Sequence, residues 1–115
     1  SLIARIIMPK KNHKTSRTLF VNEAKKLMTK EFNRWFKLTA RLTTYLNRVE
    51  HENNNKPTIY IMGSEDHMFL GSVKAIVDLN PSIELNVVPN CGHVVNIDQA
   101  EVFNAISIQF IRKTA

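Results

Sequence analysis

Two short loops of the sequence contain the side chains best suited to acid–base chemistry. Residues 63–69 read Gly-Ser-Glu-Asp-His-Met-Phe, and residues 90–94 read Asn-Cys-Gly-His-Val. Each loop follows an apolar run of strand type, and in an open α/β sheet the loops beyond the carboxyl ends of the strands share one edge of the molecule. We therefore expect Asp66 and His93 to lie side by side, with the carboxylate accepting the Nδ1 proton and Nε2 left as a base.

Three neighbouring side chains offer other chemistry in the same loops. Glu65 could be the acid in place of Asp66, and His67 could bind a metal beside it. No further ligands follow at a recognisable spacing, so we expect no metal. Cys91 could be a thiolate nucleophile for His93. We expect a small buried thiol instead, because neighbours two residues apart in a tight loop rarely point at each other and free cysteines are commonly buried.

The elements that position the two loops follow from the apolar pattern of the second half of the chain. Strands are expected at Thr58–Met62 and Ile83–Val88, and helices at Ser72–Leu79 and about Gln99–Arg112. The strand sequences are typical of strands buried on both faces. We expect Leu79 and Ile111 to face inward and Asp98 to cap the last helix. The order strand, helix, strand, helix predicts two βα units of a parallel sheet, so the fold class is α/β.

The first half of the chain is expected to be mainly helical. The pattern predicts a polar loop at residues 9–17, an amphipathic helix from about Leu19, and a longer amphipathic helix from about Glu31 to His51. Thr15 or Ser16 is the expected cap of the first helix. Two strands alone make a poor sheet, and Leu2–Met8 is the only other apolar run that could extend it.

Both loops resemble the last two triad segments of the α/β-hydrolase family. Residues 57–66 (Pro-Thr-Ile-Tyr-Ile-Met-Gly-Ser-Glu-Asp) are similar to its Gly-x-x-Asp segment, and residues 91–97 (Cys-Gly-His-Val-Val-Asn-Ile) to its Gly-His segment. The resemblance extends over roughly residues 57–112 and includes the family's last helix. It implies that Asp66, rather than Glu65, is the triad acid and that His93 is the triad base.

The nucleophile segment of that family, Gly-x-Ser-x-Gly, fits no frame of this sequence. The resemblance therefore implies the carboxy-terminal part of a hydrolase. Residues 1–56 would be a helical lid or connecting segment, and residues 57–115 the carboxy-terminal βαβα part of the core. We expect the parent enzyme to hydrolyse an ester, thioester or similar acyl bond of a small molecule without a cofactor, and this chain to be inactive alone.

Charge is distributed unevenly and suggests an alternative class of function. Residues 1–56 contain 13 Lys and Arg against 4 Glu, whereas residues 57–115 contain 3 Lys and Arg against 6 Asp and Glu. A basic half is compatible with a stand-alone module that binds nucleic acid or an anionic surface. We rank this alternative second, because charged faces of amphipathic helices are commonly just solvated.

Composition excludes some classes and sets expectations for others. The single Cys91 cannot form an internal disulfide, and no apolar stretch reaches the roughly 18 residues of a membrane-spanning helix. The apolar amino terminus is short, contains Arg5 and lacks a cleavage site, so we expect no signal peptide. We expect a cytoplasmic protein with no membrane partner. Uncovered strand edges and apolar helix faces predict self-association.

Overall fold

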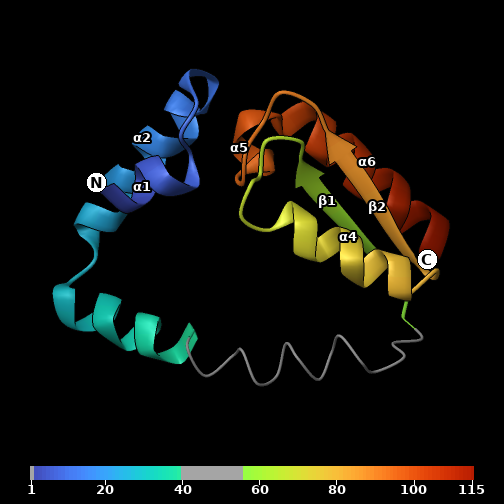
Figure 1. Ribbon diagram of the computed structural model, residues 1–115, viewed down its shortest axis with the longest axis horizontal. Helices are drawn as coiled ribbons and strands as arrows, with labels where there is room; N and C mark the ends of the chain where they lie inside the picture. The colour runs from blue at the N-terminus through green and yellow to red at the C-terminus, as the bar shows by residue number, and fades with distance from the viewer. Residues whose placement is uncertain (1, 40–55) are drawn as a thin grey trace.

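A two-stranded parallel sheet lies at the centre of the second half of the chain. The computed structural model describes residues 2–39 and 56–115 (Figure 1). Strand β1 (Thr58–Gly63) pairs with strand β2 (Ile83–Val88). The register places Gly63 opposite Val88, so both strands end at the same rung of the ladder. The loops that follow the two strands therefore begin side by side.

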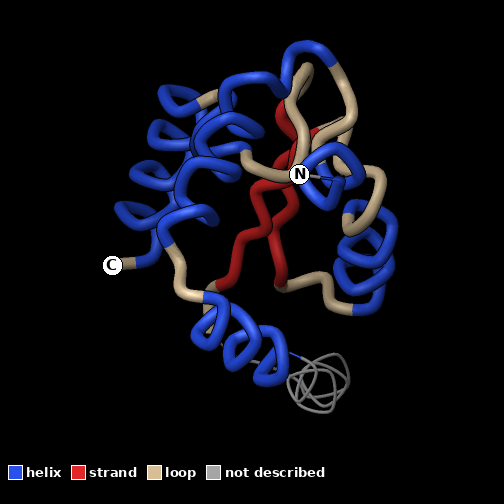
Figure 2. Tube along the Cα trace, turned by 90° about the vertical axis from the view of Figure 1, so that its left-hand side faces the viewer, coloured by secondary structure: helices blue, strands red, loops and turns tan. Residues whose placement is uncertain are grey.

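Helices cover both faces of this sheet. Helix α4 (Leu70–Leu79) connects the strands, and α5 (Val95–Asp98) and α6 (Ala100–Thr114) follow the second strand. Figure 2 shows α4 and α6 on opposite sides of the strands, and α4 forms the crossover between the two parallel strands. The predicted order of strand, helix, strand and helix is confirmed, and the fold is mixed α/β with mostly helices.

The hydrophobic core lies beneath the second loop. Val88, Cys91 and Val95 are buried together, and Ile61, Phe103 and Ile106 pack against them. Each fully buried valine contributes about 1.5–3 kcal/mol relative to an exposed one. The core therefore stabilises the turn from β2 into α5 directly, and this turn contains His93.

The N-terminal segment is mainly helical, with short non-helical connections at residues 8–10 and 27–28. It contains α1 (Leu2–Ile7), the 3₁₀ turn η1 (Lys11–His13) and α2 (Lys14–Lys26), and residues 29–39 are also helical. Ala4 and Met8 are fully buried. The Arg17 guanidinium donates hydrogen bonds to the Met8 and Lys10 carbonyls, at 2.6 and 3.2 Å. Arg17 thereby fixes the return of the chain from α1 to α2.

The structure corrects the prediction that Leu2–Met8 could extend the sheet. This run forms α1 and packs against α2. Its two buried side chains, Ala4 and Met8, are four residues apart and so lie on one helix face. The described part of the sheet contains only β1 and β2, and most residues of both strands are only half-buried or exposed. The prediction of strands buried on both faces is therefore wrong.

Helix starts also differ from the predictions. Helix α2 begins at Lys14 without a side-chain cap, and Ser16 lies within it and donates to the His13 carbonyl at 3.1 Å. Asp98 ends α5 and does not cap α6, because its carboxylate accepts the Gly92 N–H at 3.4 Å instead. In both places a hydrogen bond to a nearby backbone group uses the side-chain oxygen that the sequence pattern would assign to a cap.

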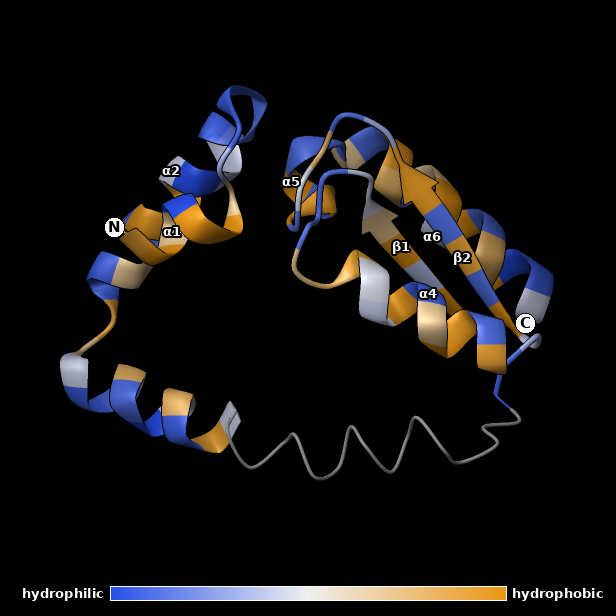
Figure 3. Ribbon diagram, viewed as in Figure 1, coloured by the Kyte–Doolittle hydropathy of each residue, from blue (hydrophilic) through white to orange (hydrophobic). Residues whose placement is uncertain are grey.

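Several apolar side chains remain exposed, contrary to prediction. Leu79 is 67% exposed and Ile111 is 61% exposed. The helix at residues 29–39 has one apolar and one polar side (Figure 3), and its apolar side chains Phe32, Trp35, Phe36 and Leu38 are exposed. The remainder of the predicted helix up to His51 lies outside the described residues. Among the described helices, none combines the length and apolarity needed to cross a bilayer.

Candidate active site

Asp66 and His93 form a hydrogen-bonded pair at the carboxyl edge of the sheet. The Nδ1 atom of His93 lies 2.8 Å from Oδ2 of Asp66. A carboxylate can only accept, so Nδ1 bears the proton and donates it, which leaves the Nε2 lone pair free in the neutral ring. Asp66 is 2% exposed, whereas the His93 side chain is 42% exposed. The pair thus has a buried acid and an imidazole that a substrate can reach.

The Asp66 carboxylate is oriented by its own loop. Its Oδ1 atom accepts the backbone N–H groups of Met68 and Phe69, at 3.2 and 3.1 Å. The Phe69 ring packs against the His93 imidazole, with ring centroids 4.8 Å apart and planes tilted by 34°. The turn that fixes the carboxylate therefore also supplies the surface against which the imidazole rests.

Backbone hydrogen bonds join the two loops. The Ser64 N–H donates to the Val88 carbonyl at 2.8 Å, and the Glu65 N–H donates to the Cys91 carbonyl at 3.0 Å. At Gly63 the loops approach so closely that a β-carbon would overlap the carbonyl group of Cys91. Glycine is required there because no side chain fits between the loops.

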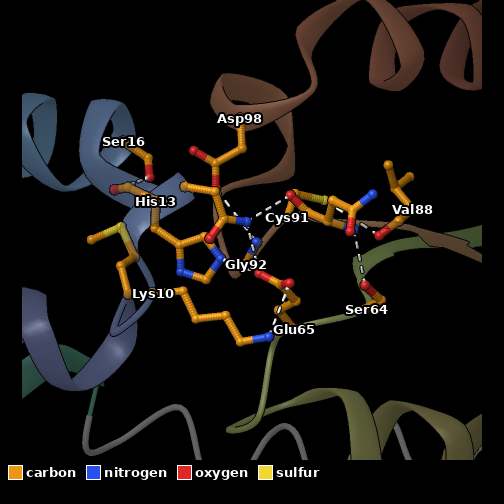
Figure 4. Close-up of polar contacts among 12 residues, drawn as sticks. Lys10, His13, Ser16, Ser64, Glu65, Val88, Cys91, Gly92 and Asp98 are labelled. Atoms are coloured by element: carbon orange, nitrogen blue, oxygen red, sulfur yellow. Dashed lines mark hydrogen bonds and ion pairs between the residues drawn. The ribbon is translucent and has the colours of Figure 1, made fainter.

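Glu65 binds the N-terminal segment, and Figure 4 shows its carboxylate beside Lys10 and His13. Its carboxylate accepts hydrogen bonds from Asn12 at 2.9 Å and His13 at 2.7 Å, and pairs with Lys10 at 2.9 Å. The hydrogen bond from Asn12 and then that from Lys10 lower the pKa of Glu65 to about 2. Of the two candidate acids, Asp66 is hydrogen-bonded to His93, whereas Glu65 is hydrogen-bonded to His13.

Cys91 lies in the core and is fully buried. Its thiol donates to the Val88 carbonyl, with the sulfur 3.4 Å from the oxygen. Burial, followed by the negative charges of Asp98 and Glu65, raises the pKa of the thiol. A buried thiol with a raised pKa is a poor nucleophile.

His67 is exposed, on the side of the loop where a cleft of about 460 Å³ opens. The cleft is lined by Pro9, Lys10, Ser64, Glu65, Asp66, His67, Leu70, Gly71 and Lys74. His93 does not line it, so this cleft gives the imidazole no substrate pocket. In residues 2–39 and 56–115, no three His, Cys, Asp or Glu side chains are grouped so that they could hold a metal ion.

Sequence reasoning missed three residues of the N-terminal segment that contact the loops. Lys10, Asn12 and His13 lie in the stretch expected to be an unstructured polar loop, yet His13 is fully buried against Gly92. More than 50 residues separate His13 from Glu65, and no spacing rule connects positions so far apart. No local sequence pattern indicated that the histidine of this polar run, His13, would be buried.

Among the described residues, the His93 side chain hydrogen-bonds to Asp66 and to no hydroxyl or thiol. The pair as it stands can accept and return a proton. No family model matches the chain, and no similar protein was found among curated proteins or among solved structures.

Proposed function

We propose that Asp66 and His93 are the acid and base of a serine-hydrolase triad, in the carboxy-terminal part of an α/β-hydrolase that cleaves an ester, thioester or similar acyl bond. The observation that carries this proposal is the 2.8 Å hydrogen bond between a buried carboxylate and an accessible imidazole. The two groups extend from the ends of adjacent parallel strands, in the chain order acid then histidine, as in that fold.

The geometry supports a division of labour between the two side chains. Nε2 of His93 would take the proton of the nucleophile and later return it to the leaving group. Asp66 keeps the proton on Nδ1 and stabilises the imidazolium that forms. The backbone N–H groups of Met68 and Phe69 hold the carboxylate in place during both steps.

The burial of Asp66 is itself informative. A buried carboxylate loses its hydration, which costs free energy unless hydrogen bonds compensate. Two backbone N–H groups and one imidazole N–H supply that compensation. A hydrophobic residue would fill the same space at no such cost, so a role that uses the charge explains the residue better than a purely structural role.

The nucleophile and the oxyanion-hole donors would come from outside these 115 residues, since the sequence contains no Gly-x-Ser-x-Gly. Triad members act as one device, so the chain alone should not turn over esters. Turnover of a p-nitrophenyl acyl ester by the isolated chain, abolished in His93→Ala, would show that a nucleophile lies within it and would overturn this part of the proposal.

The decisive experiment joins the chain to the residues encoded upstream of it and measures p-nitrophenyl ester hydrolysis. We expect a Gly-x-Ser-x-Gly there, and a loss of at least about 10³-fold in kcat for His93→Gln. The exposed His67→Gln is the matched control and should retain activity. Upstream residues without that motif, or an esterase that is indifferent to His93→Gln, would refute the proposal.

A further inference from the structure

One short stretch of the N-terminal segment contacts both loops of the candidate site. The side-chain amide of Asn12 donates to Glu65 Oε2 and to the Asn90 carbonyl, both at 2.9 Å. Glu65 belongs to the loop of the acid, and Asn90 belongs to the loop of the base. Asn12 is therefore a bridge between the two loops.

His13 makes a second bridge beside the first. Its Nε2 atom lies 2.7 Å from Glu65 Oε2, and its ring is fully buried against Gly92. A β-carbon at Gly92 would lie only 2.6 Å from Cε1 of the ring. The other ring nitrogen, Nδ1, is buried without a hydrogen-bond partner. Packing and one charged hydrogen bond hold the ring there, at the expense of an unsatisfied acceptor.

The residues held by these bridges are the immediate neighbours of the candidate triad residues. Glu65 precedes Asp66 in the chain, and Gly92 precedes His93. We infer that Asn12 and His13 are positioning residues, which hold the acid loop and the histidine loop at the separation that the Asp66–His93 hydrogen bond requires. The catalytic meaning of this inference rests on the proposed function.

A merely structural role would be different. In that case Asn12 and His13 would attach the N-terminal helices to the sheet, and the backbone bonds between the loops would hold the pair by themselves. Loss of either side chain would then loosen the helices and leave the His93 imidazole unchanged. An NMR signal from the His93 imidazole distinguishes the positioning role from the structural role.

The test is NMR of the full chain labelled with ¹⁵N-histidine. The Nδ1 proton of His93, assigned by its absence in His93→Gln, reports its hydrogen bond to Asp66. We expect Asn12→Ala to move this resonance upfield and to speed its exchange with water several-fold. His13→Leu should have a larger effect, and His13→Gln, which keeps a donor toward Glu65, should restore part of the signal.

A control variant and a measurement of folding accompany this test. Glu23→Gln breaks an exposed ion pair with Lys26 far from the loops and should leave the resonance unchanged. Asn12 is exposed, so Asn12→Ala should fold, as circular dichroism will verify, even if His13→Leu does not. A folded Asn12→Ala chain with an unchanged His93 resonance would overturn the inference.

The outcome also distinguishes this inference from the proposed function. A resonance that responds to Asn12→Ala, together with no esterase activity in the protein that includes the upstream residues, would refute the hydrolase assignment and retain the positioning role of Asn12. An unchanged His93 resonance in an active esterase would refute the positioning role and retain the hydrolase assignment.

Discussion

Adjacent carboxylates in one loop bind different histidines, and burial separates their roles. Asp66 binds His93, whose side chain is 42% exposed, whereas Glu65 binds His13, whose side chain is fully buried. Only the first histidine is exposed to solvent. The second is enclosed by its protein neighbours.

The proton on the His93 ring should depend on the charge of Asp66. Asp66→Asn keeps an oxygen for the Met68 and Phe69 N–H groups and turns its amide donor toward Nδ1. We expect Nδ1 to become the acceptor and the proton to move to Nε2, the tautomer that cannot act as a base. Ring ¹⁵N chemical shifts would measure the change. An unaltered tautomer would mean that Asp66 does not orient the ring.

Two glycines should respond oppositely to the same substitution. Gly92→Ala places a methyl group against the buried His13 ring, and we expect a loss of about 1–3 kcal/mol from overpacking. Gly71→Ala lies in α4 with open space around it, and the gain in helix propensity should stabilise the chain by about 0.5–1 kcal/mol. Urea unfolding would measure both values. Equal effects at the two positions would refute the close packing of His13.

The proximity of Asp66 and His93 was predictable from the sequence, because residues that follow adjacent parallel strands must share one edge. The preference for Asp66 over Glu65 came only from the family resemblance, since loop position and residue type alone do not tell which of two neighbouring carboxylates points toward His93. Asn12 and His13 were beyond prediction for another reason. Their partners lie more than 50 residues away, and only packing of the N-terminal segment brings them together.

For helices and strands, long-range contacts decided between structures that the local sequence pattern did not distinguish. The two strands were predicted to within one residue because each is a short run rich in β-branched residues and followed by glycine or proline. The run Leu2–Met8 is also short, apolar and followed by a proline, yet it forms α1, and its buried residues Ala4 and Met8 lie on one helix face. Apolar runs of this length do not distinguish a strand from a helix.

Attachment of the N-terminal segment to the loops should weaken in acid. Folding lowers the pKa of Glu65 from 4.5 to about 2, so its carboxylate stabilises the attachment above pH 4.5 and less as the pH falls toward 2. The protection of the amides of residues 10–13, taken relative to the intrinsic exchange rate at each pH, should therefore fall across that range. In Glu65→Gln the protection should already be low at pH 7 and change little with acid. Identical pH profiles for the two chains would contradict this account.

At the scale of the whole molecule, many large apolar side chains of the described residues are exposed to solvent. Leu2, Ile3 and Ile6 are exposed on α1, and Trp35 and Phe36 are exposed on the helix at residues 29–39. Large contiguous apolar patches mark sites of association. A two-stranded sheet also leaves both strand edges without partners in the described part of the chain.

We therefore expect the isolated chain to self-associate. Sedimentation velocity should show a mass that rises with concentration, and the double variant Trp35→Gln, Phe36→Gln should shift the distribution toward monomer. Ile108→Gln, which removes one exposed apolar side chain from α6, is the matched control and should have a smaller effect. A monomer at every concentration would show that these faces do not associate.

The buried thiol of Cys91 can report local opening of the structure near the site. Its side chain is buried in the core with Val88 and Val95, and its raised pKa slows reaction further. A disulfide reagent can reach it only when this packing opens. The backbone carbonyl of Cys91 also bonds to the loop that contains Asp66, so the rate of thiol labelling under native conditions should increase in Asn12→Ala.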